Sequence, residues 1–400
     1  MIERIDKKFC VGCFACENVC YTNCIQMIAD AEGFLYPKVD KAKCINCGLC
    51  EKVCPIIEQN RISNEKIAID NISNENIIID NIANENTAYA CFNKNEAIRS
   101  ESSSGGIFWL LAQNIISSGG VVFGAAFDDN INLVHMHTDN IEGITKFMGS
   151  KYLQSKIGKS YQIAKKFLDN NIKVLFSGTP CQIAGLLKYL GREYDNLLCA
   201  DLICHGVPSP KAFELYRTKL ERIYGATTSE ISFRKKNEGW KQFSLSLIFN
   251  NNTEHKQTVD KDLYLKAFLQ NVCLRPSCYN CNFKTLNRQS DITLGDFWGI
   301  ENIMPEMDDN KGISLVFVNS EKGNLMMKSI KESIIYREVD INQAVKYNSA
   351  AIQSAKYNTK RDAFMKDLDK LPFNILAKKY CSDRIYTRII RKLKFILKSI

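Results

Sequence analysis

Short apolar runs alternate with segments of helical spacing through most of the chain after residue 88. The most apolar stretch, 107–127, predicts a helix, a polar turn and a buried strand that begins at Val121. Gln113, Asn114 and the small or polar residues at 117–120 interrupt this stretch, so it is too broken to span a membrane. These elements are therefore expected in a folded core.

The same alternation continues over the next hundred residues. Helical spacing at 161–168 leads to a β-rich run at 173–176. A second helix at 181–190 stops at Gly191, and the run 196–203 supplies another buried strand. Strands and helices that alternate in this way predict an α/β domain in which helices pack on a sheet.

Residues 58–87 have a different character, because a ten-residue unit recurs there. It reads ISNEKIAIDN from Ile62, ISNENIIIDN from Ile72 and IANENT from Ile82. The composition predicts a polar, partly disordered spacer, and a small local strand pair formed by the isoleucine triplets stays open as the alternative. In either form it separates an N-terminal module from everything that follows.

The C-terminal segment 384–400 predicts a basic amphipathic helix, because apolar residues recur at helical spacing among Arg and Lys side chains. Packing on its own domain is the expectation. Contact with an anionic membrane surface or with a partner subunit stays open.

Two cysteine quartets near the N-terminus share the spacing C-x2-C-x2-C-x3-C. This is the ligand spacing of bacterial ferredoxins with two 4Fe-4S clusters, in which the fourth cysteine of each run binds the other cluster. Zinc, the rival metal, uses two separated C-x2-4-C pairs and has no use for the additional cysteines. The predicted ligand sets are Cys10, Cys13, Cys16 and Cys54 for one cluster, and Cys44, Cys47, Cys50 and Cys20 for the other.

Four later cysteines are candidates for a third cluster. Cys181 follows one predicted strand, Cys204 ends the next, and Cys278 and Cys281 form a C-x2-C pair. Ligands gather at the carboxyl ends of strands in α/β sheets, which favours a third 4Fe-4S site there. Two alternatives stay open: the first two cysteines as small buried residues, and the C-x2-C pair as half of a zinc site. Cys273 is a candidate substitute ligand.

Composition limits the class of protein and its partners. The chain has 400 residues, 17 cysteines and a formal net charge of +9. Because the cysteines cluster as ligands for soft metals and nothing before Cys10 resembles a signal peptide, a reducing, cytoplasmic location is expected. The dispersed positive charge favours acidic electron donors or phosphate-bearing cofactors and does not call for nucleic acid. The cysteines without a partner at ligand spacing are predicted to be structural, namely Cys24, Cys91, Cys199 and Cys381.

The run Glu-Ser-Ser-Ser-Gly-Gly at 101–106 leads straight into the helix predicted from residue 107. Consecutive backbone N–H groups at a helix N-terminus, with hydroxyls beside them and no bulky side chain, suit the phosphates of a cofactor. A serine N-cap after a loop is the competing interpretation.

The histidines offer little chemistry. His135 and His137 share one face of a predicted strand and are expected to be a surface pair, since no third ligand lies near them in the sequence. His205 adjoins Cys204 and is expected to influence a cluster there through a hydrogen bond. No catalytic acid or base is identified.

Six runs in the chain together resemble the coenzyme F420 hydrogenase/dehydrogenase beta subunit family, in its bacterial type with an N-terminal two-cluster ferredoxin domain. The resemblance covers nearly the whole chain from Asp6 to about residue 320, although Tyr21 stands where the first quartet usually carries proline. The runs are SSSGGIFWLLA from Ser102, GSKYLQS from Gly149, FSGTPCQIAGL from Phe176, DLICHGVPSP from Asp201, LRPSCYNCNF from Leu274 and DITLGDFWGI from Asp291.

The resemblance implies FAD together with a 4Fe-4S cluster held by Cys181, Cys204, Cys278 and Cys281. It implies flavin contacts at Ser103, Ser104, Gly105, Gly106, Ser150, Lys151 and Tyr152. The expected architecture is a ferredoxin-type domain at 1–57, a linker at 58–87, an α/β flavin and iron-sulfur domain at 88–350 and a helical tail at 351–400.

The expected function follows from the resemblance and from electron counting. Clusters carry single electrons and organic acceptors require two, so a flavin is the natural converter. Electrons are expected to move between an external ferredoxin or reductase and a small two-electron carrier or metabolite, for which a deazaflavin is one candidate. The alternative is a non-catalytic subunit that relays electrons to a separate enzyme.

Overall fold

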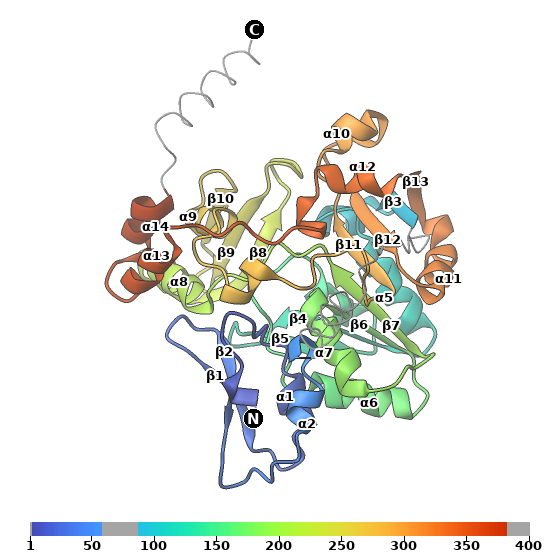
Figure 1. Ribbon diagram of the computed structural model, residues 1–400. Coiled ribbons are helices and arrows are strands. Elements are labelled where there is room, and N and C mark those ends of the chain that lie inside the picture. Colours follow the sequence, from blue (N-terminus) through green and yellow to red (C-terminus); the bar gives the residue numbers. More distant parts are fainter. Residues whose placement is uncertain (1, 58–86, 382–400) are drawn as a thin grey trace, which may run out of the picture.

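The computed structural model describes residues 2–57 and 87–381. Figure 1 shows a small N-terminal module, a large sheet flanked by helices, and a lobe built from helices and a second, smaller sheet. The decapeptide repeats up to residue 86 and the amphipathic segment 384–400 lie outside the described residues. Within the described ranges, no helix is long and apolar enough to cross a membrane.

The N-terminal module combines two cysteine loops with a two-stranded antiparallel sheet. Strands β1 (Ile25–Ala29) and β2 (Leu35–Val39) pair from Ile25↔Val39 to Ala29↔Leu35. Each cysteine loop runs into a short helix, α1 (Ala15–Val19) or α2 (Leu49–Lys52), and the turn η1 (Ile2–Arg4) contacts β2. The prediction of a small ferredoxin-like module is confirmed.

A mixed eight-stranded sheet forms the centre of the larger part, in the order β13-β3-β12-β11-β7-β6-β4-β5. Strands β11, β7, β6 and β4 are parallel to one another, and the strands on both flanks pair antiparallel. The bounds are β3 (Thr87–Asn93), β4 (Val121–Phe127), β5 (Leu133–Thr138), β6 (Val174–Gly178), β7 (Leu197–Leu202), β11 (Ile292–Asp296), β12 (Ser314–Val318) and β13 (Ile334–Val339). The predicted α/β domain is confirmed, and β3 already begins at the last residue of the predicted linker.

Helices cover both faces of this sheet. Successive residues of a strand point to opposite faces, so neighbouring residues pack with different helices. Val174 and Phe176 of β6 pack with helices α6 (Ser160–Asp169) and α7 (Pro180–Leu190), whereas Leu175 packs with α5 (Ile107–Ser117) and α11 (Glu321–Ser329). Strands buried on both faces need continuous apolar runs, which is the pattern that predicted them. Every helix and strand predicted between residues 107 and 203 is present to within about two residues, the usual uncertainty at element ends.

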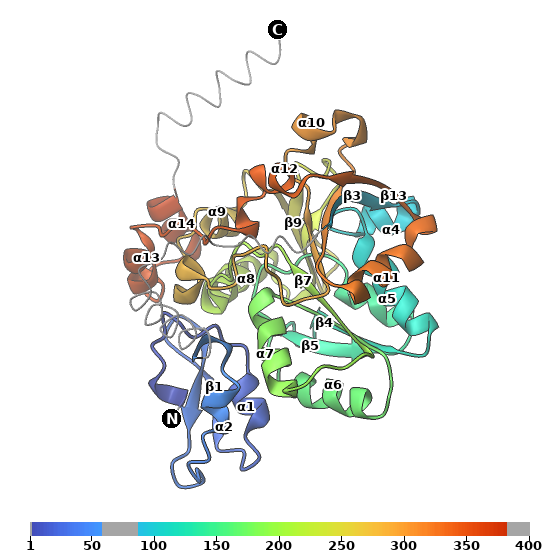
Figure 2. The same cartoon turned by 45° about the vertical axis from the view of Figure 1, so that its right-hand side comes forward.

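The remaining lobe was not predicted in detail. Its three-stranded antiparallel sheet has the order β10-β9-β8, formed by β8 (Thr228–Lys235), β9 (Ser244–Phe249) and β10 (Glu254–Thr258). Helices α8 (Pro210–Tyr224), α9 (Leu263–Leu269), α13 (Arg361–Asp367) and α14 (Phe373–Cys381) share its hydrophobic core. The described part of the predicted tail is thus packed onto this lobe (Figure 2).

Short segments complete the described chain. They are α4 (Glu96–Glu101), η2 (Glu142–Phe147), η3 (Pro276–Asn280), α10 (Ile300–Ile303), η4 (Pro305–Met307), η5 (Lys331–Ser333), α12 (Ile341–Lys346) and η6 (Ser349–Ala351).

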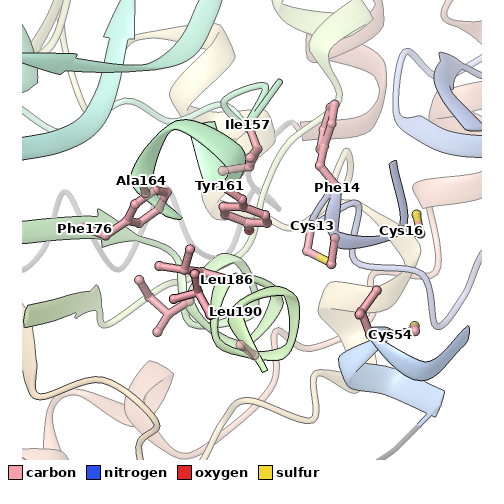
Figure 3. Close-up of a cluster of buried hydrophobic side chains, with 14 of the residues drawn as sticks. Cys13, Phe14, Cys16, Cys54, Ile157, Tyr161, Ala164, Phe176, Leu186 and Leu190 are labelled. Carbon is pink, nitrogen blue, oxygen red and sulfur yellow. The ribbon is translucent and has the colours of Figure 1, made fainter. Parts of the chain in front are cut away.

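The N-terminal module packs closely against α6 and α7. Figure 3 shows Tyr161 of α6 beside Cys13 and Phe14 of the module. A Cβ atom added at Gly185 of α7 would lie 2.8 Å from Cys13 Cβ, so only glycine allows this approach. The side-chain amide of Asn18 in α1 donates to the Gly158 carbonyl at 2.8 Å, and the backbone carbonyl of Asn18 accepts from the Gln162 side chain at 2.7 Å. The first cysteine quartet is thereby held against the helix that begins with Pro180 and Cys181.

Candidate electron-transfer site

The structure brings the eight N-terminal cysteines together as two sets around separate cavities. The inner site consists of Cys10, Cys13, Cys16 and Cys54, and the outer site of Cys20, Cys44, Cys47 and Cys50. Each set combines the first three cysteines of one run with the fourth cysteine of the other run. Cys47 is exposed, whereas all four cysteines of the inner site are buried.

The backbone explains why each quartet forms a tight concave loop. Gly12 and Phe14 flank Cys13 with φ values of 64° and 67°, and Asn46 and Gly48 flank Cys47 with 54° and 75°. Left-handed residues on both sides of a cysteine turn consecutive N–H groups inward, as in the anion-binding concavities that hold iron-sulfur groups. Burial raises the pKa of Cys13 to about 12, so metal binding must displace the thiol proton.

A third set of four cysteines converges at the edge of the large sheet. Cys181 begins α7 directly after β6, Cys204 follows the neighbouring parallel strand β7, and Cys278 and Cys281 lie on and after η3. All four line one cavity, the sheet-edge site. Burial raises the pKa of Cys278 to about 12, and the Val207 N–H points at its sulfur at 3.4 Å.

Three cationic side chains line the same cavity, which matters because a cluster held by four thiolates is negatively charged. Arg275, Lys284 and Arg288 stand around the sheet-edge site. Lys284 donates to the carbonyls of Cys204 and Ala350, and Arg288 lies 3.6 Å from the buried Asp201. Burial raises the pKa of Asp201 to about 6, while Arg288 acts in the opposite direction.

The remaining cysteines lie apart from this cavity. Cys273 is fully buried in the core of the lobe and is not among the residues around the sheet-edge site. Cys91, Cys199 and Cys381 are also buried in hydrophobic clusters. Cys24 differs from them, because its sulfur lies 3.3 Å from Cys20 Sγ and it lines the outer site.

Among the described residues, no three Cys, His, Asp or Glu side chains converge on a position for one metal ion. That search concerns a single ion. A 4Fe-4S cluster is held differently, because each thiolate binds a different iron of the cluster.

A cavity of about 640 Å³ opens at the carboxyl ends of the parallel strands. Ala125, Ser177, Leu202 and Asp296 line it from β4, β6, β7 and β11 in turn. Six of the seven candidate flavin residues line this large cavity, namely Ser103, Ser104, Gly106, Ser150, Lys151 and Tyr152. Gly105 does not, because it packs against the sheet, where an added Cβ would lie 2.5 Å from the Cys91 carbonyl oxygen.

The N-terminus of α5 faces this cavity without a side-chain cap. Its N-cap residue is Gly106, with φ 80°, and no side chain accepts from the first turn. A serine N-cap is therefore not what the structure has at this position. Ser103 Oγ accepts from the Ser150 N–H at 2.5 Å, which joins the two candidate segments into one wall.

Two titratable groups of the wall have shifted pKa values. Burial lowers the pKa of Lys151 to about 7, and its ammonium donates to the Met148 and Lys146 carbonyls at 2.7 and 2.9 Å. Burial also lowers the pKa of His135 to about 4. A lysine that changes charge near neutral pH is suited to respond to an anionic ligand.

The expectation of a surface histidine pair is wrong for His135. Its ring nitrogens lie 2.7 Å from Ser155 Oγ and 2.9 Å from the Ser177 carbonyl, whereas His137 is exposed. The reason is that the segment around Lys156 runs parallel beside β5 and exchanges backbone hydrogen bonds with it, which brings Ser155 to the histidine ring.

The large cavity and the sheet-edge site share one wall. Thr179, Cys204, His205, Gly206 and Val207 line both. The His205 Nε2 atom lies 2.6 Å from Asn271 Oδ1, and the ring packs edge-on against Phe268. Cys204, a candidate cluster ligand, thus lies between the two spaces.

Two family models match the chain. The model for the C-terminal part of the "Coenzyme F420 hydrogenase/dehydrogenase, beta subunit" matches residues 172–344, and "4Fe-4S dicluster domain" matches residues 9–56. Residues 172–344 thus belong to the family of the coenzyme F420 hydrogenase/dehydrogenase beta subunit, C-terminal part. The N-terminal module matches a 4Fe-4S dicluster domain, and the resemblance drawn from the sequence runs is confirmed by these two matches.

A solved structure is also similar to this chain. It is titled "Xenon derivatization of the F420-reducing [NiFe] hydrogenase complex from Methanosarcina barkeri", with 16% identity and a TM-score of 0.43. The similarity covers 73% of this chain and 90% of that one. No curated protein matches significantly.

Several residues that shape the site were missed from the sequence. Arg275 and Gln154 lie between the inner and sheet-edge sites, and the buried ion pair of Arg234 with Asp296 lines the large cavity. Arg275 and Asp296 stand inside sequence runs typical of the beta subunit family. A single charged residue in a run carries no signal of burial, so only the folded chain identifies them.

Proposed function

We propose that this protein is an iron-sulfur flavoprotein oxidoreductase with a third 4Fe-4S cluster at the sheet-edge site and FAD in the large cavity. The observation that carries the proposal is the shared wall, because Cys204 lines both spaces. When bound, the clusters exchange single electrons and the flavin exchanges two, so two cluster electrons match one two-electron reduction of an organic acceptor.

The arrangement of the three cysteine sites supports a continuous path. Cys16 and Cys20 lie at and just beyond α1 and belong to the inner and outer sites respectively. Cys13 of the inner site lies against Gly185, which is one turn of α7, about 6 Å, from Cys181 of the sheet-edge site. Val11 lines both of those cavities.

The outer site supports an external electron partner. Cys47 and its neighbour Ile45 are exposed, and Ile45 retains 58% of its accessible surface. Lys41 and Lys43 nearby are exposed as well. An exposed cluster edge with an apolar side chain beside it suits contact with a small external donor such as a ferredoxin, although Lys41 and Lys43 pair with Glu3 and Asp40.

Three features of the large cavity support the proposal of FAD. Its volume lies within the range of roughly 300–1,000 Å³ that is usual for ligand sites. The uncapped N–H groups of α5 and the hydroxyl of Ser103, which accepts from Ser150 and keeps its own proton, suit the pyrophosphate. The aromatic ring of Tyr152, stacked on Phe268 at 4.8 Å, adds a flat apolar wall.

The test is cofactor content of the anaerobically purified full chain, measured as iron, acid-labile sulfide and released flavin. About twelve iron atoms and one FAD per chain are expected for three clusters and a flavin. About eight iron atoms without flavin would contradict the proposal and favour a relay subunit without its own substrate. With FAD present, a screen of deazaflavin and other two-electron carriers identifies the acceptor.

The lowered pKa of Lys151 leads us to expect that flavin affinity depends on pH. Burial holds its pKa near 7 in the free protein, and an anionic cofactor beside it stabilises the ammonium and raises that pKa. Affinity is then highest below pH 7 and falls as pH rises through 7, by at most about tenfold per pH unit for one proton. FAD dissociation constants measured by fluorescence between pH 6 and 9 check this.

The matched variants are Lys151→Met, which flattens the profile, and Lys146→Met, which changes an exposed lysine outside the cavity and keeps the profile. A flat profile for the unaltered protein would contradict the role of Lys151.

A further inference from the structure

Arg275 is a buried cation that connects two cysteine sites. Its side chain is 1% exposed and lines the sheet-edge site. The Arg275 carbonyl accepts from the Cys278 N–H at 2.9 Å, which fixes the arginine beside a sheet-edge ligand. Its guanidinium reaches in the opposite direction, into the N-terminal module.

The guanidinium contacts Cys10, the first cysteine of the inner site. Nε donates to the Cys10 carbonyl at 2.8 Å, and Nη2 lies 3.8 Å from Cys10 Sγ and 2.9 Å from the Leu35 carbonyl. Nη1 donates to Gln154 Oε1 at 3.1 Å, and Gln154 donates in turn to the Val11 carbonyl. The loop at Gly12 is shaped around this group, since an added Cβ would lie 2.9 Å from Nη1.

No carboxylate neutralises this charge in the described structure. The hydrogen-bond partners of the guanidinium are carbonyl oxygens, an amide oxygen and a sulfur, and the rings of Tyr36 and Phe34 lie 4.4 and 5.5 Å from it. The carboxylates of the nearby β1–β2 turn have other partners. Asp30 pairs with Lys7 at 3.1 Å, and Glu32 pairs with Arg361. Because an unpaired buried cation is costly, its counter-charge is expected from the cysteine sites it touches.

We propose that Arg275 is a positioning residue that balances the charge of the inner cluster and raises its reduction potential. Adding one electron makes the cluster and its thiolates more negative, and a fixed cation at Cys10 stabilises that reduced form. The inference rests on the inner site of the dicluster domain and goes beyond the proposed flavin chemistry.

The experiment is an anaerobic redox titration of the full chain, followed by electron paramagnetic resonance, with a Cys47→Ser background used to separate the outer cluster's signal. Arg275→Gln is expected to lower the inner cluster's potential by a shift equal to about tenfold in the reduction equilibrium, about 59 mV for one electron. Arg275→Lys keeps the charge and is expected to stay near the unaltered protein.

Two further variants separate the effect of the charge from the effect of the contact between the N-terminal module and the lobe. Gln154→Glu keeps the arginine and places a carboxylate beside Nη1, so the potential is expected to fall as in Arg275→Gln. Arg361→Gln is the matched control, because Arg361 is also buried and also ties the module to the lobe, through Glu32, without a hydrogen bond to a cysteine sulfur in the described structure. Its potential is expected to stay unchanged.

Equal potentials in all variants would overturn the proposal, and so would an equal shift in Arg361→Gln, which would make docking the cause. If Arg275→Gln does not retain its iron, Gln154→Glu decides the matter: an unchanged potential overturns the proposal. Flavin is released and measured from the same samples. Its absence would contradict the proposed function and leave the result for Arg275 intact.

Discussion

Replacing Cys278 by serine is expected to remove about four iron atoms per chain and to leave the flavin content unchanged. The physical reason is that Cys278 is one of four thiols around a single buried cavity, and a serine hydroxyl is a harder and less acidic ligand for iron. Reduction of the flavin by a ferredoxin-type donor is expected to slow by more than about 100-fold. Substitution of residues that only contact metal ligands typically costs up to about 100-fold in activity, and loss of a ligand is expected to cost more.

Cys273→Ala is the matched control, five residues earlier in the chain. Cys273 is fully buried, whereas Cys278 is partly buried, and Cys273 lies in the core of the lobe with Tyr264 and Cys381. This variant is expected to lose some thermal stability and to keep its full iron content. The third cluster would be contradicted if Cys278→Ser kept all its iron, or if both variants lost the same amount.

Substitution of Gly106 by alanine is expected to release the flavin while the iron content stays constant. Gly106 has φ 80°, a conformation that costs an alanine about 1–2 kcal/mol. A Cβ there would also press on Ser102 Oγ at 3.3 Å. The loop is expected to relax by turning the first N–H groups of α5 away from the cavity, and flavin affinity is expected to fall by about tenfold or more.

The control lies at the opposite end of the same helix. Gly119 has φ 76°, and an added Cβ would meet nothing within 4 Å. Gly119→Ala therefore carries a similar backbone cost without touching the large cavity. Thermal melting is expected to show comparable losses in both variants, whereas flavin loss is confined to Gly106→Ala. Full flavin retention in Gly106→Ala would contradict the assignment of the α5 N-terminus to the cofactor.

Local spacing was enough to predict the N-terminal module and the alternation of the large domain. A C-x2-C-x2-C run places its cysteines on one loop whatever surrounds it, because short segments have few conformations. Apolar periodicity predicted α6, α7, β6 and β7 for a similar reason, since burial on both faces of a parallel strand leaves no polar positions. The antiparallel strands β3, β12 and β13 and the three-stranded lobe lacked such a signal.

The sequence by itself determined which residue types were available: two ferredoxin-type quartets, two cysteines behind neighbouring strands, a C-x2-C pair and a small-residue turn before a helix. Only the tertiary structure decided that the two cysteines behind neighbouring strands and the C-x2-C pair share a cavity. It also decided that Gly105 packs against the sheet while its neighbours line the large cavity, and that Arg275 contacts Cys10. Those contacts join residues far apart in the chain, and they depend on how whole elements pack rather than on spacing within any one of them.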